Sequence, residues 1–407
     1  MATETEPAST PILAARLPEE IVTAESVPGP VHARVLFQAA HNRLRLGEAR
    51  QFRRLLDAHR SLLHRRNAEV ERTVRDHAGN VKLKLRFADG AAVEAVVLFD
   101  PGSGDGAGAG SGPGTRRRQP RRTLCLSTQV GCSMGCRFCR TGGLGLRRNL
   151  TTEEIVEQYL AARERLGPLS NIVFMGMGEP LLNTRAVFAA ARVFAHPHGP
   201  EIPFKRITVS TCGIPAGIDR LTSESFLAHL PGARPRLAVS LVTAEPILRA
   251  HLMPGATRLA VGVATAAPPA DVATAEAPAP PATVAAAALE NLRAAVARYL
   301  ERTGRPVTFE VPLLGGVNDS EEAAAAVCSF LGSLPRSDRC DVNLIPWNRV
   351  EGVPFTPPTE TAVSAFAARI LAGGYSVTGR FPRGRSIAAA CGQLGESVSP
   401  LSRRRQP

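Results

Sequence analysis

Three cysteines, Cys132, Cys136 and Cys139, form a C-x3-C-x2-C run in this chain. The spacing can bring three thiolates together in one short loop. A structural zinc site needs a closed set of four protein ligands, whereas an iron–sulfur cube held by three cysteines leaves one iron open to a chelating small molecule. The run therefore indicates an iron–sulfur site with one open coordination position.

The chain has 407 residues, of which 44% are apolar, so it can bury a large core. It contains no run of eighteen apolar residues, and its first residues lack the basic start and apolar core of a secretory signal. We therefore expect a cytoplasmic protein that does not enter a membrane. In a reducing compartment its eight cysteines are metal ligands, reactive thiols or packing residues. Cys212, Cys328 and Cys340 are expected to be packing residues.

The charge balance favours a polyanionic partner. Lys and Arg outnumber Asp and Glu by 49 to 36, a net charge of +13, although an arginine-rich proteome would also raise this balance. Arginines gather before and after the cysteine loop, at 116–118, 121–122, 137, 140, 147 and 148. They predict a basic rim near the site, which suits RNA or DNA.

The sequence before the cysteine loop divides into three parts. Residues 31–75 carry apolar positions at helical spacing, and 1–78 are predicted to form a helical accessory domain. In 79–100, two alternating segments flank Asp89-Gly90 and predict a β-hairpin that carries Glu94. Residues 101–123 are rich in Gly, Ser, Pro and Arg and are predicted to be a flexible linker.

Residues 124–395 alternate between short apolar strands and helical segments. Strands are expected near 171–175, 206–210, 236–241, 307–311 and 341–345, and helices near 152–165, 184–196, 288–302, 320–333 and 358–372. This order predicts parallel βα units, in either a doubly wound sheet or a full or partial barrel, with functional residues at the carboxyl ends of the strands. An Ala- and Pro-rich insert at 256–287 is expected to be poorly ordered, and 396–407 form a basic tail.

Together, three motifs resemble one family. The cysteine run, Gly-Met-Gly-Glu-Pro-Leu at 176–181 and Ala-Cys-Gly-Gln-Leu at 390–394 are similar to those of radical S-adenosylmethionine RNA methyltransferases of the RlmN and Cfr type. The resemblance extends from about Val81 to Gly395. It implies an α/β fold in which a partial (β/α)6 barrel follows the helical domain and the hairpin.

The resemblance also implies a mechanism. Carbon 2 of adenine is electron-poor and cannot attack a sulfonium methyl group, so the family uses one 4Fe-4S cluster and two S-adenosylmethionine molecules per turnover. Cys391 would carry a methyl group, lose a hydrogen atom from it to a 5′-deoxyadenosyl radical and form a covalent adduct with RNA. Glu94 resembles the proton acceptor, and Cys125 the thiol that resolves the adduct and leaves a disulfide. Without the resemblance, Glu94 would be an exposed strand carboxylate and Cys125 a packing residue.

Further residues are implied to bind the second S-adenosylmethionine. Gly178 allows close backbone approach, and Glu179 can accept a hydrogen bond from the ammonium group. The remaining implied contacts are Ser210, Ser240, Leu241, Val242 and Asn348. Relatives usually have histidine where this chain has Val242, and the sequence does not decide whether the side chain or the backbone is used there.

The sequence thus predicts an RNA methyltransferase that acts on carbon 2 of an adenosine in 23S rRNA and as a second target in tRNA. It would be a monomer that receives electrons from a donor such as flavodoxin. One alternative is methylation at carbon 8, as in the Cfr branch. Others are a radical enzyme with a different substrate and a non-catalytic RNA-binding protein whose cysteines bind zinc.

Overall fold

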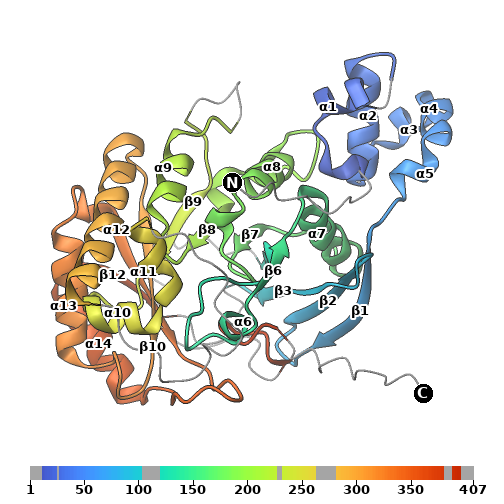
Figure 1. Ribbon diagram of the computed structural model, residues 1–407. Helices are drawn as coiled ribbons and strands as arrows, with labels where there is room; N and C mark the ends of the chain where they lie inside the picture. The colour runs from blue at the N-terminus through green and yellow to red at the C-terminus, as the bar shows by residue number, and fades with distance from the viewer. Residues whose placement is uncertain are drawn as a thin grey trace, which may run out of the picture.

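One mixed β-sheet organises the molecule (Figure 1). The computed structural model describes residues 12–24, 27–102, 120–226, 232–262, 281–379 and 387–395. Within these residues the sheet has the strand order β1-β2-β3-β4-β7-β8-β9-β10-β11-β12. Its strands are β1 (Ala68–Arg75), β2 (Val81–Phe87), β3 (Ala92–Asp100), β4 (Arg121–Cys125), β7 (Asn171–Phe174), β8 (Ile207–Thr211), β9 (Arg236–Ser240), β10 (Val307–Leu313), β11 (Cys340–Pro346) and β12 (Ser376–Gly379).

The sheet has an antiparallel part and a parallel part. Strands β1, β2, β3 and β4 follow chain order in the sheet, and each is antiparallel to the next. From β4 to β12 every neighbouring pair is parallel. The parallel strands follow chain order without a reversal. A doubly wound sheet reverses its strand order at a switch point, whereas a barrel-type sheet does not. The order therefore agrees with the barrel alternative, in an open form whose edges are β1 and β12.

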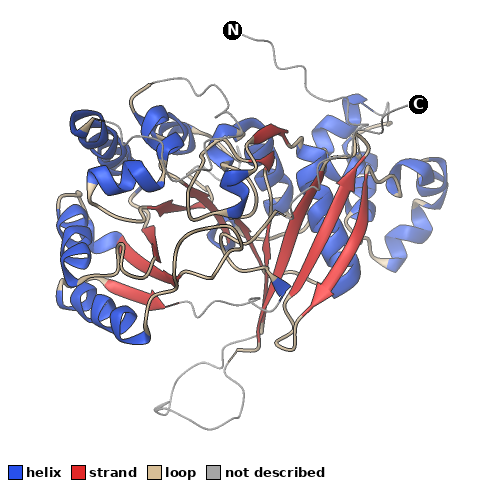
Figure 2. Ribbon diagram, turned by 60° about the horizontal axis from the view of Figure 1, so that its bottom comes forward, coloured by secondary structure: helices blue, strands red, loops and turns tan. Residues whose placement is uncertain are grey.

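Helices connect the parallel strands. They are α7 (Thr152–Leu166), α8 (Thr184–Ala195), α9 (Pro215–Ser223), α10 (Pro246–Leu252), α11 (Pro254–Ala260), α12 (Ala282–Thr303), α13 (Glu321–Gly332) and α14 (Glu360–Ala372). Right-handed connections between strands in consecutive order place successive helices on the same face of the sheet. Figures 1 and 2 show these helices around the outside of the strands.

Local sequence signals explain where several helices begin and end. Thr151 caps α7, since its side chain accepts the Glu154 N–H and its own N–H donates to the Glu154 carboxylate. Helix α12 ends at Gly304, which has a left-handed φ of 62°. The strand that follows α12, β10, is largely buried on both faces, as expected for a central parallel strand.

The N-terminal part contains α1 (Pro18–Ala24), α2 (Pro30–Ala40), α3 (Leu46–Gln51), α4 (Arg53–Ala58) and α5 (Arg60–Leu63). The prediction of a helical unit over 1–78 was wrong at its end, because Ala68–Arg75 is strand β1. Alternate side chains of this strand are more exposed, and its charged residues suit an edge strand. The two strands of the expected hairpin, β2 and β3, are therefore the middle strands of an antiparallel meander formed by β1 to β4.

Two other boundaries differ from the predictions. The predicted linker 101–123 ends in the first residues of β4, which pairs with both β3 and β7. The predicted insert 256–287 begins in α11 and ends in α12, because alanine is a strong helix former. Residues 103–119, 263–280 and the tail 396–407 lie outside the described residues.

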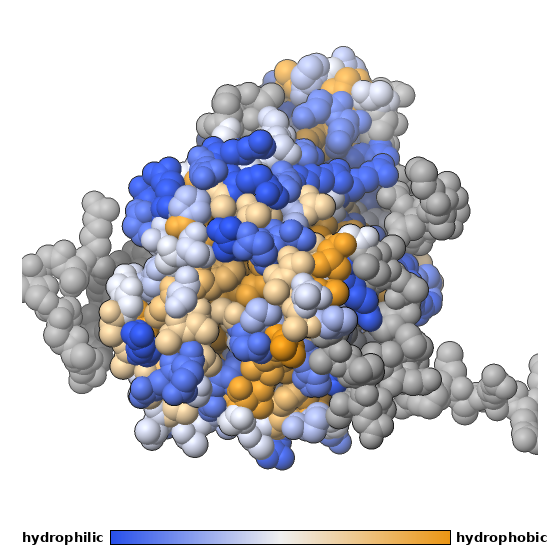
Figure 3. All heavy atoms as spheres, turned by 60° about the vertical axis from the view of Figure 1, so that its left-hand side comes forward, coloured by the Kyte–Doolittle hydropathy of each residue, from blue (hydrophilic) through white to orange (hydrophobic). Residues whose placement is uncertain are grey.

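The surface is mixed in polarity. On the face in Figure 3, hydrophilic side chains cover the upper part and hydrophobic surface gathers in the centre and below. Among the described residues, no helix has the length and apolar content that a membrane span requires.

Candidate active site

The cysteine loop is enclosed by a small antiparallel pair, β5 (Gln129–Gly131) and β6 (Leu146–Asn149), with the short helix α6 (Arg140–Gly143) between them. Gly131 has a φ of 78°, and a Cβ atom there would overlap the carbonyl oxygen of Gly145. The same carbonyl accepts the Cys132 N–H at 2.8 Å. Glycine is therefore required immediately before the first cysteine.

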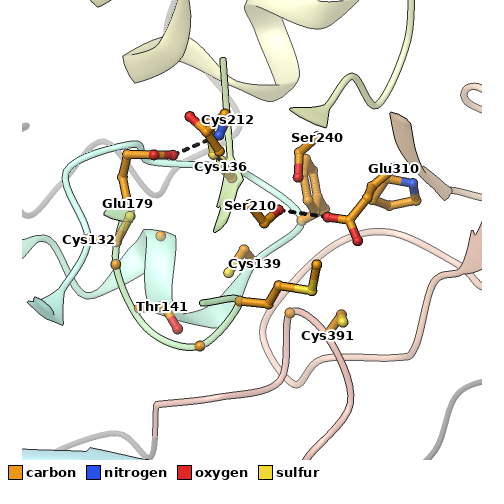
Figure 4. A pocket seen from close by; sticks show the side chains of 18 of the residues that line it. Cys132, Cys136, Cys139, Thr141, Glu179, Ser210, Cys212, Ser240, Glu310 and Cys391 are labelled. Carbon is orange, nitrogen blue, oxygen red and sulfur yellow. Dashed lines mark hydrogen bonds between the residues drawn. The ribbon is translucent and has the colours of Figure 1, made fainter. Parts of the chain in front are cut away.

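Cys132, Cys136 and Cys139 line one cavity (Figure 4). Burial raises the pKa of the Cys132 thiol and of the Cys139 thiol. A nearby cation is needed to hold such thiols as thiolates, and iron provides it. In a cube each thiolate binds a different iron, so the three sulfur atoms need not converge on one point. The donor set and its enclosure fit an iron–sulfur cluster bound by three cysteines.

A fourth cysteine enters the same cavity. The Sγ atom of Cys212, directly after β8, lies 3.9 Å from the Sγ atom of Cys136. Its hydrogen bond with Cys136 and its burial raise the pKa of the Cys212 thiol. Cys212 packs against the core, as expected, but it also lines the cavity, which the sequence did not predict. Its position after a polar Ser-Thr strand end was the sequence signal that could have placed it in the site.

The loop after β7 carries Gly178 and Glu179, and both line the cavity. A Cβ atom on Gly178 would lie 2.5 Å from the Cβ atom of Gln129, and Gly178 has a φ of 97°. The Glu179 carboxylate accepts the N–H groups of Leu181 at 3.0 Å and Cys212 at 2.7 Å. Burial raises the pKa of Glu179. Glu179 thus ties two loops of the cavity wall together and retains lone pairs for a ligand.

Ser210 and Ser240, at the ends of β8 and β9, also line the cavity. The Ser210 hydroxyl donates to Oε2 of Glu310 at 2.8 Å (Figure 4). Glu310 lies on β10 and is 5% exposed, and Asn343 donates weakly to its other oxygen at 3.4 Å. Sequence reasoning missed Glu310, because a carboxylate inside an apolar strand gives no local signal of what it faces.

Three of the residues expected to contact S-adenosylmethionine lie outside the cavity lining. Leu241, Val242 and Asn348 are buried but do not line the cavity. Val242 has a φ of 64°, strained for a β-branched residue, and the Thr243 N–H donates across it to the Leu241 carbonyl at 2.7 Å.

At position 242 the backbone makes the polar contacts. The Val242 N–H donates to the Glu310 carbonyl at 3.2 Å, and its own carbonyl accepts from the Asn318 side chain at 2.8 Å. The side chain is fully buried. In this chain, position 242 therefore shapes the end of β9 through its backbone.

Cys391 reaches the cavity from the C-terminal segment 387–395. Figure 4 shows its sulfur facing the same space as the cysteine loop. The Arg140 N–H donates to the Gly392 carbonyl at 2.9 Å, and the Thr141 hydroxyl donates to the Leu394 carbonyl at 2.6 Å. Two residues directly after Cys139 therefore dock the segment that presents Cys391.

Glu94 and Cys125 lie on the neighbouring strands β3 and β4, where Val96 is the partner of Cys125. Both are buried, and neither lines the cavity. Glu94 nevertheless contacts the C-terminal segment, because its Oε2 atom accepts the Gly395 N–H at 2.7 Å. Without the family resemblance, Glu94 was expected to be an exposed strand carboxylate. Its side chain is instead buried.

The predicted basic rim is only partly available to a ligand. Arg148 forms ion pairs with Asp89 and Glu154, each at 2.8 Å. Arg140 lies 3.9 Å from Glu351. Residues 116–118 lie outside the described residues. The rim is therefore partly neutralised, by Glu154, six residues from Arg148, and by Asp89 and Glu351, which come from distant parts of the chain.

The fold and the three-thiol cavity define the class of a radical S-adenosylmethionine enzyme. Residues 126–327 match the model of the Radical SAM superfamily. A crystal structure of a radical SAM methyltransferase from Sphaerobacter thermophilus is 34% identical, has a TM-score of 0.73 and matches over 94% of this chain and 98% of that one.

Curated relatives identify the family within this class of enzymes. A probable dual-specificity RNA methyltransferase RlmN of Treponema pallidum (strain Nichols) is 39% identical over 332 residues, covering 82% of this chain and 81% of the relative. A dual-specificity RNA methyltransferase RlmN of Nitratidesulfovibrio vulgaris is 38% identical over 334 residues, covering 80% of this chain and 77% of the relative. The chain therefore belongs to the RlmN family of radical S-adenosylmethionine RNA methyltransferases.

Proposed function

We propose that the protein methylates carbon 2 of an adenosine in 23S rRNA and, as a second substrate, in tRNA, using Cys391 as the methyl carrier. The observation that carries this proposal is that Cys391 lines the same cavity as Cys132, Cys136 and Cys139. A carrier sulfur must be close to the cofactor that removes hydrogen from its methyl group. The names of the relatives, dual-specificity RNA methyltransferases, support more than one RNA substrate.

The cavity has the donors and acceptors that the cofactors need. When bound by the three cysteines, a 4Fe-4S cluster would supply the electron for cleavage of S-adenosylmethionine to a 5′-deoxyadenosyl radical, and its open iron would chelate that molecule. Glu179 would accept a hydrogen bond from the ammonium group of that molecule, and its position in the cavity wall supports this role. Ser210 and Ser240 contribute hydroxyl groups, and Glu310 contributes a carboxylate that can accept both ribose hydroxyls.

Cys391, Glu94 and Cys125 have successive roles. Cys391 would take a methyl group from a first S-adenosylmethionine and lose one hydrogen atom from it to the 5′-deoxyadenosyl radical. The methylene radical that remains would add to the adenine carbon, and the adduct radical would then give one electron back to the cluster. Glu94 then accepts the proton of that carbon. The Cys125 thiolate attacks the Cys391 sulfur, so that an S–S bond forms and the S–C bond breaks. The electron pair of the broken bond stays with the product methylene group, which takes up a proton.

RNA is the macromolecular partner in this proposal. Helices α3 and α4 have no buried residues, and they present the exposed side chains of Arg50, Arg53 and Arg54. Exposed arginines suit phosphate contacts. We infer a cytoplasmic monomer that takes electrons from a donor such as flavodoxin and whose thiols are reset by cellular reductants.

Digestion of RNA after reaction with the cluster-loaded protein tests the proposal. The expected product is 2-methyladenosine, which is absent with Cys391→Ala and retained with Cys328→Ala, a control in α13. A methyl group at carbon 8 would overturn the choice of carbon. Full RNA methylation by the Cys391→Ala variant would overturn the carrier role.

A further inference from the structure

Lys82 and Glu94 form a buried ion pair beside the site. Nζ of Lys82 lies 2.9 Å from Oε1 of Glu94, and the two side chains are 7% and 3% exposed. Lys82 is opposite Val96 in the pairing of β2 with β3, so it lies diagonally from Glu94 on the same face of the sheet. Burying two charges costs several kcal/mol per ion unless geometry and further hydrogen bonds compensate.

The further hydrogen bonds go to the carrier segment, which we define as residues 387–395. Lys82 donates to the Ala388 carbonyl at 3.2 Å, near the beginning of this segment. Glu94 accepts the N–H of Gly395, at its end, at 2.7 Å. The ion pair therefore binds the carrier segment on both sides of Cys391.

The backbone of the carrier segment is strained where Lys82 holds it. Ala388 has a φ of 48°, in the left-handed region that residues with a Cβ atom rarely adopt. Such conformations cost on the order of 1–3 kcal/mol and persist only where surrounding contacts determine them. The contact with Lys82 is one of these, and its loss favours release of the segment.

Glu94 is also tied to the loop of the cofactor site. The Ser127 hydroxyl donates to the Glu94 carbonyl at 2.6 Å and accepts the Met177 N–H at 2.9 Å. The backbone of Glu94 is thus fixed relative to the Gly176–Glu179 turn, while its carboxylate is shared between Lys82 and Gly395. While Gly395 donates to Oε2, one lone pair of this oxygen is engaged, so the oxygen is a weaker proton acceptor than it becomes after release.

We propose that Lys82 is a positioning residue that holds the Glu94 carboxylate and docks the carrier segment, and that RNA engagement releases Gly395 from Glu94. This inference rests on the proposed function for the role of Glu94. After release, Oε2 accepts the proton of the adenine carbon in the adduct, and the electron pair of that C–H bond stays on the adduct. Lys82 stays in contact with Oε1 and keeps the carboxylate in place.

Lys82→Met tests the docking, with Lys84→Met as the matched control. Lys84 lies on the same strand and face and is directly opposite Glu94 in the pairing of β2 with β3, but its Nζ contacts Glu71 at 3.5 Å and its side chain is 23% exposed. In the cluster-loaded full chain without RNA, hydrogen exchange is measured on peptides that cover 387–395. Exchange is expected to be about tenfold or more faster in Lys82→Met, as loss of about 1.4 kcal/mol would produce, and unchanged in Lys84→Met.

A double variant controls for the possibility that Lys82→Met alone misfolds. Lys82→Met alone leaves the Glu94 charge buried without its lysine, which destabilises proteins strongly. Lys82→Met with Glu94→Gln leaves neither charge, and the amide that replaces the Glu94 carboxylate still offers an acceptor to Gly395. Because the Ala388 contact and the ionic character of the Gly395 bond are lost, exchange of the carrier segment is again expected to rise. Unchanged exchange in both variants would overturn the docking role.

The positioning role is tested by separating two reactions of Cys391. In Lys82→Met, the S-methylation of Cys391 is expected to remain within about twofold of wild type, while the covalent protein–RNA adduct persists about tenfold longer. Lys82→Arg, which keeps the charge, is expected to restore much of the adduct resolution. Equal loss of both reactions would indicate a merely structural role and overturn the positioning role.

The two readouts separate this inference from the proposed function. The exchange measurement uses neither RNA nor S-adenosylmethionine, so it remains decisive if the protein methylates a different substrate. If wild type forms no adduct, the proposed function fails, but the exchange measurement still decides whether Lys82 docks the carrier segment. If wild type forms the adduct and Lys82→Met resolves it at the same rate, the positioning role alone fails.

Discussion

Replacement of Gly142 by alanine is expected to impair cluster binding, and replacement of its neighbour Gly143 is not. Both glycines lie in α6, directly after the last cysteine of the loop. A Cβ atom on Gly142 would lie 2.6 Å from the carbonyl oxygen and 2.8 Å from the nitrogen of Cys136, whereas one on Gly143 meets nothing within 4 Å. The two substitutions are chemically identical and differ only in this contact.

The magnitude follows from the displacement that the new methyl group requires. Ordinary contacts begin at 3.4 Å, so the backbone of Cys136 or α6 must move by about 0.8 Å. Overpacking of this kind costs about 1–3 kcal/mol. Because each 1.4 kcal/mol is a factor of ten, the loop is expected to bind its cluster about 5- to 150-fold less well. Gly143→Ala is expected to be neutral or slightly stabilising, since alanine is the better helix former.

The assay is anaerobic reconstitution with limiting iron and sulfide, followed by iron and sulfide analysis and cluster absorption for the two variants and wild type. Wild type and Gly143→Ala are expected to reach about four irons and four sulfides per chain, and Gly142→Ala to remain well below this value. Thermal unfolding of the cluster-free proteins checks that both variants are folded. Equal cluster content in the two variants would refute the argument that the approach of α6 to Cys136 shapes the binding loop.

Two further predictions concern buried carboxylates. Burial raises the pKa of Glu157 from 4.5 to about 7, so the wild type should lose up to about 3 kcal/mol of stability as pH rises from about 4.5 to about 7, because the unfolded chain ionises first. Glu157→Gln keeps an acceptor for the Asn67 N–H and should remove this pH dependence of the unfolding free energy, measured from urea unfolding curves. If wild type and Glu157→Gln show the same pH dependence, burial of Glu157 is not its cause. Glu310→Gln should weaken S-adenosylmethionine binding to the cluster-loaded protein about tenfold in equilibrium dialysis, as expected for loss of a charge-assisted hydrogen bond worth about 1.5–3 kcal/mol. Unchanged affinity would exclude Glu310 from the cofactor site.

The sequence predicted the parallel part of the fold well because its signals are local. Strands such as β8 and β10 and helices such as α7 and α13 show apolar runs or helical spacing between clear caps, and the structure has them near the predicted positions. Strands β1, β4 and β12 were missed. Each is short, or charged at its start, and each is strand only because it pairs with a neighbour in the sheet.

The site shows the same limit. The cysteine run and the glycine loop are contiguous motifs, so local spacing was sufficient to propose them. Cys212, Glu310 and Lys82 were missed because they contribute through partners that are distant in the chain, namely Cys136, Ser210 and Glu94. Such pairings come from the sheet order and from docking of the carrier segment, and neither leaves a signal in one sequence.

The most direct test of the central claim is mass mapping of Cys391 in protein isolated from cells. The claim is that the thiol in the cysteine-loop cavity carries the methyl group destined for RNA. A methyl group, and after partial turnover an RNA adduct, are expected on the peptide that contains Cys391, and neither is expected on the peptide that contains Cys328. Active protein in which Cys391 never carries a methyl group would contradict the account.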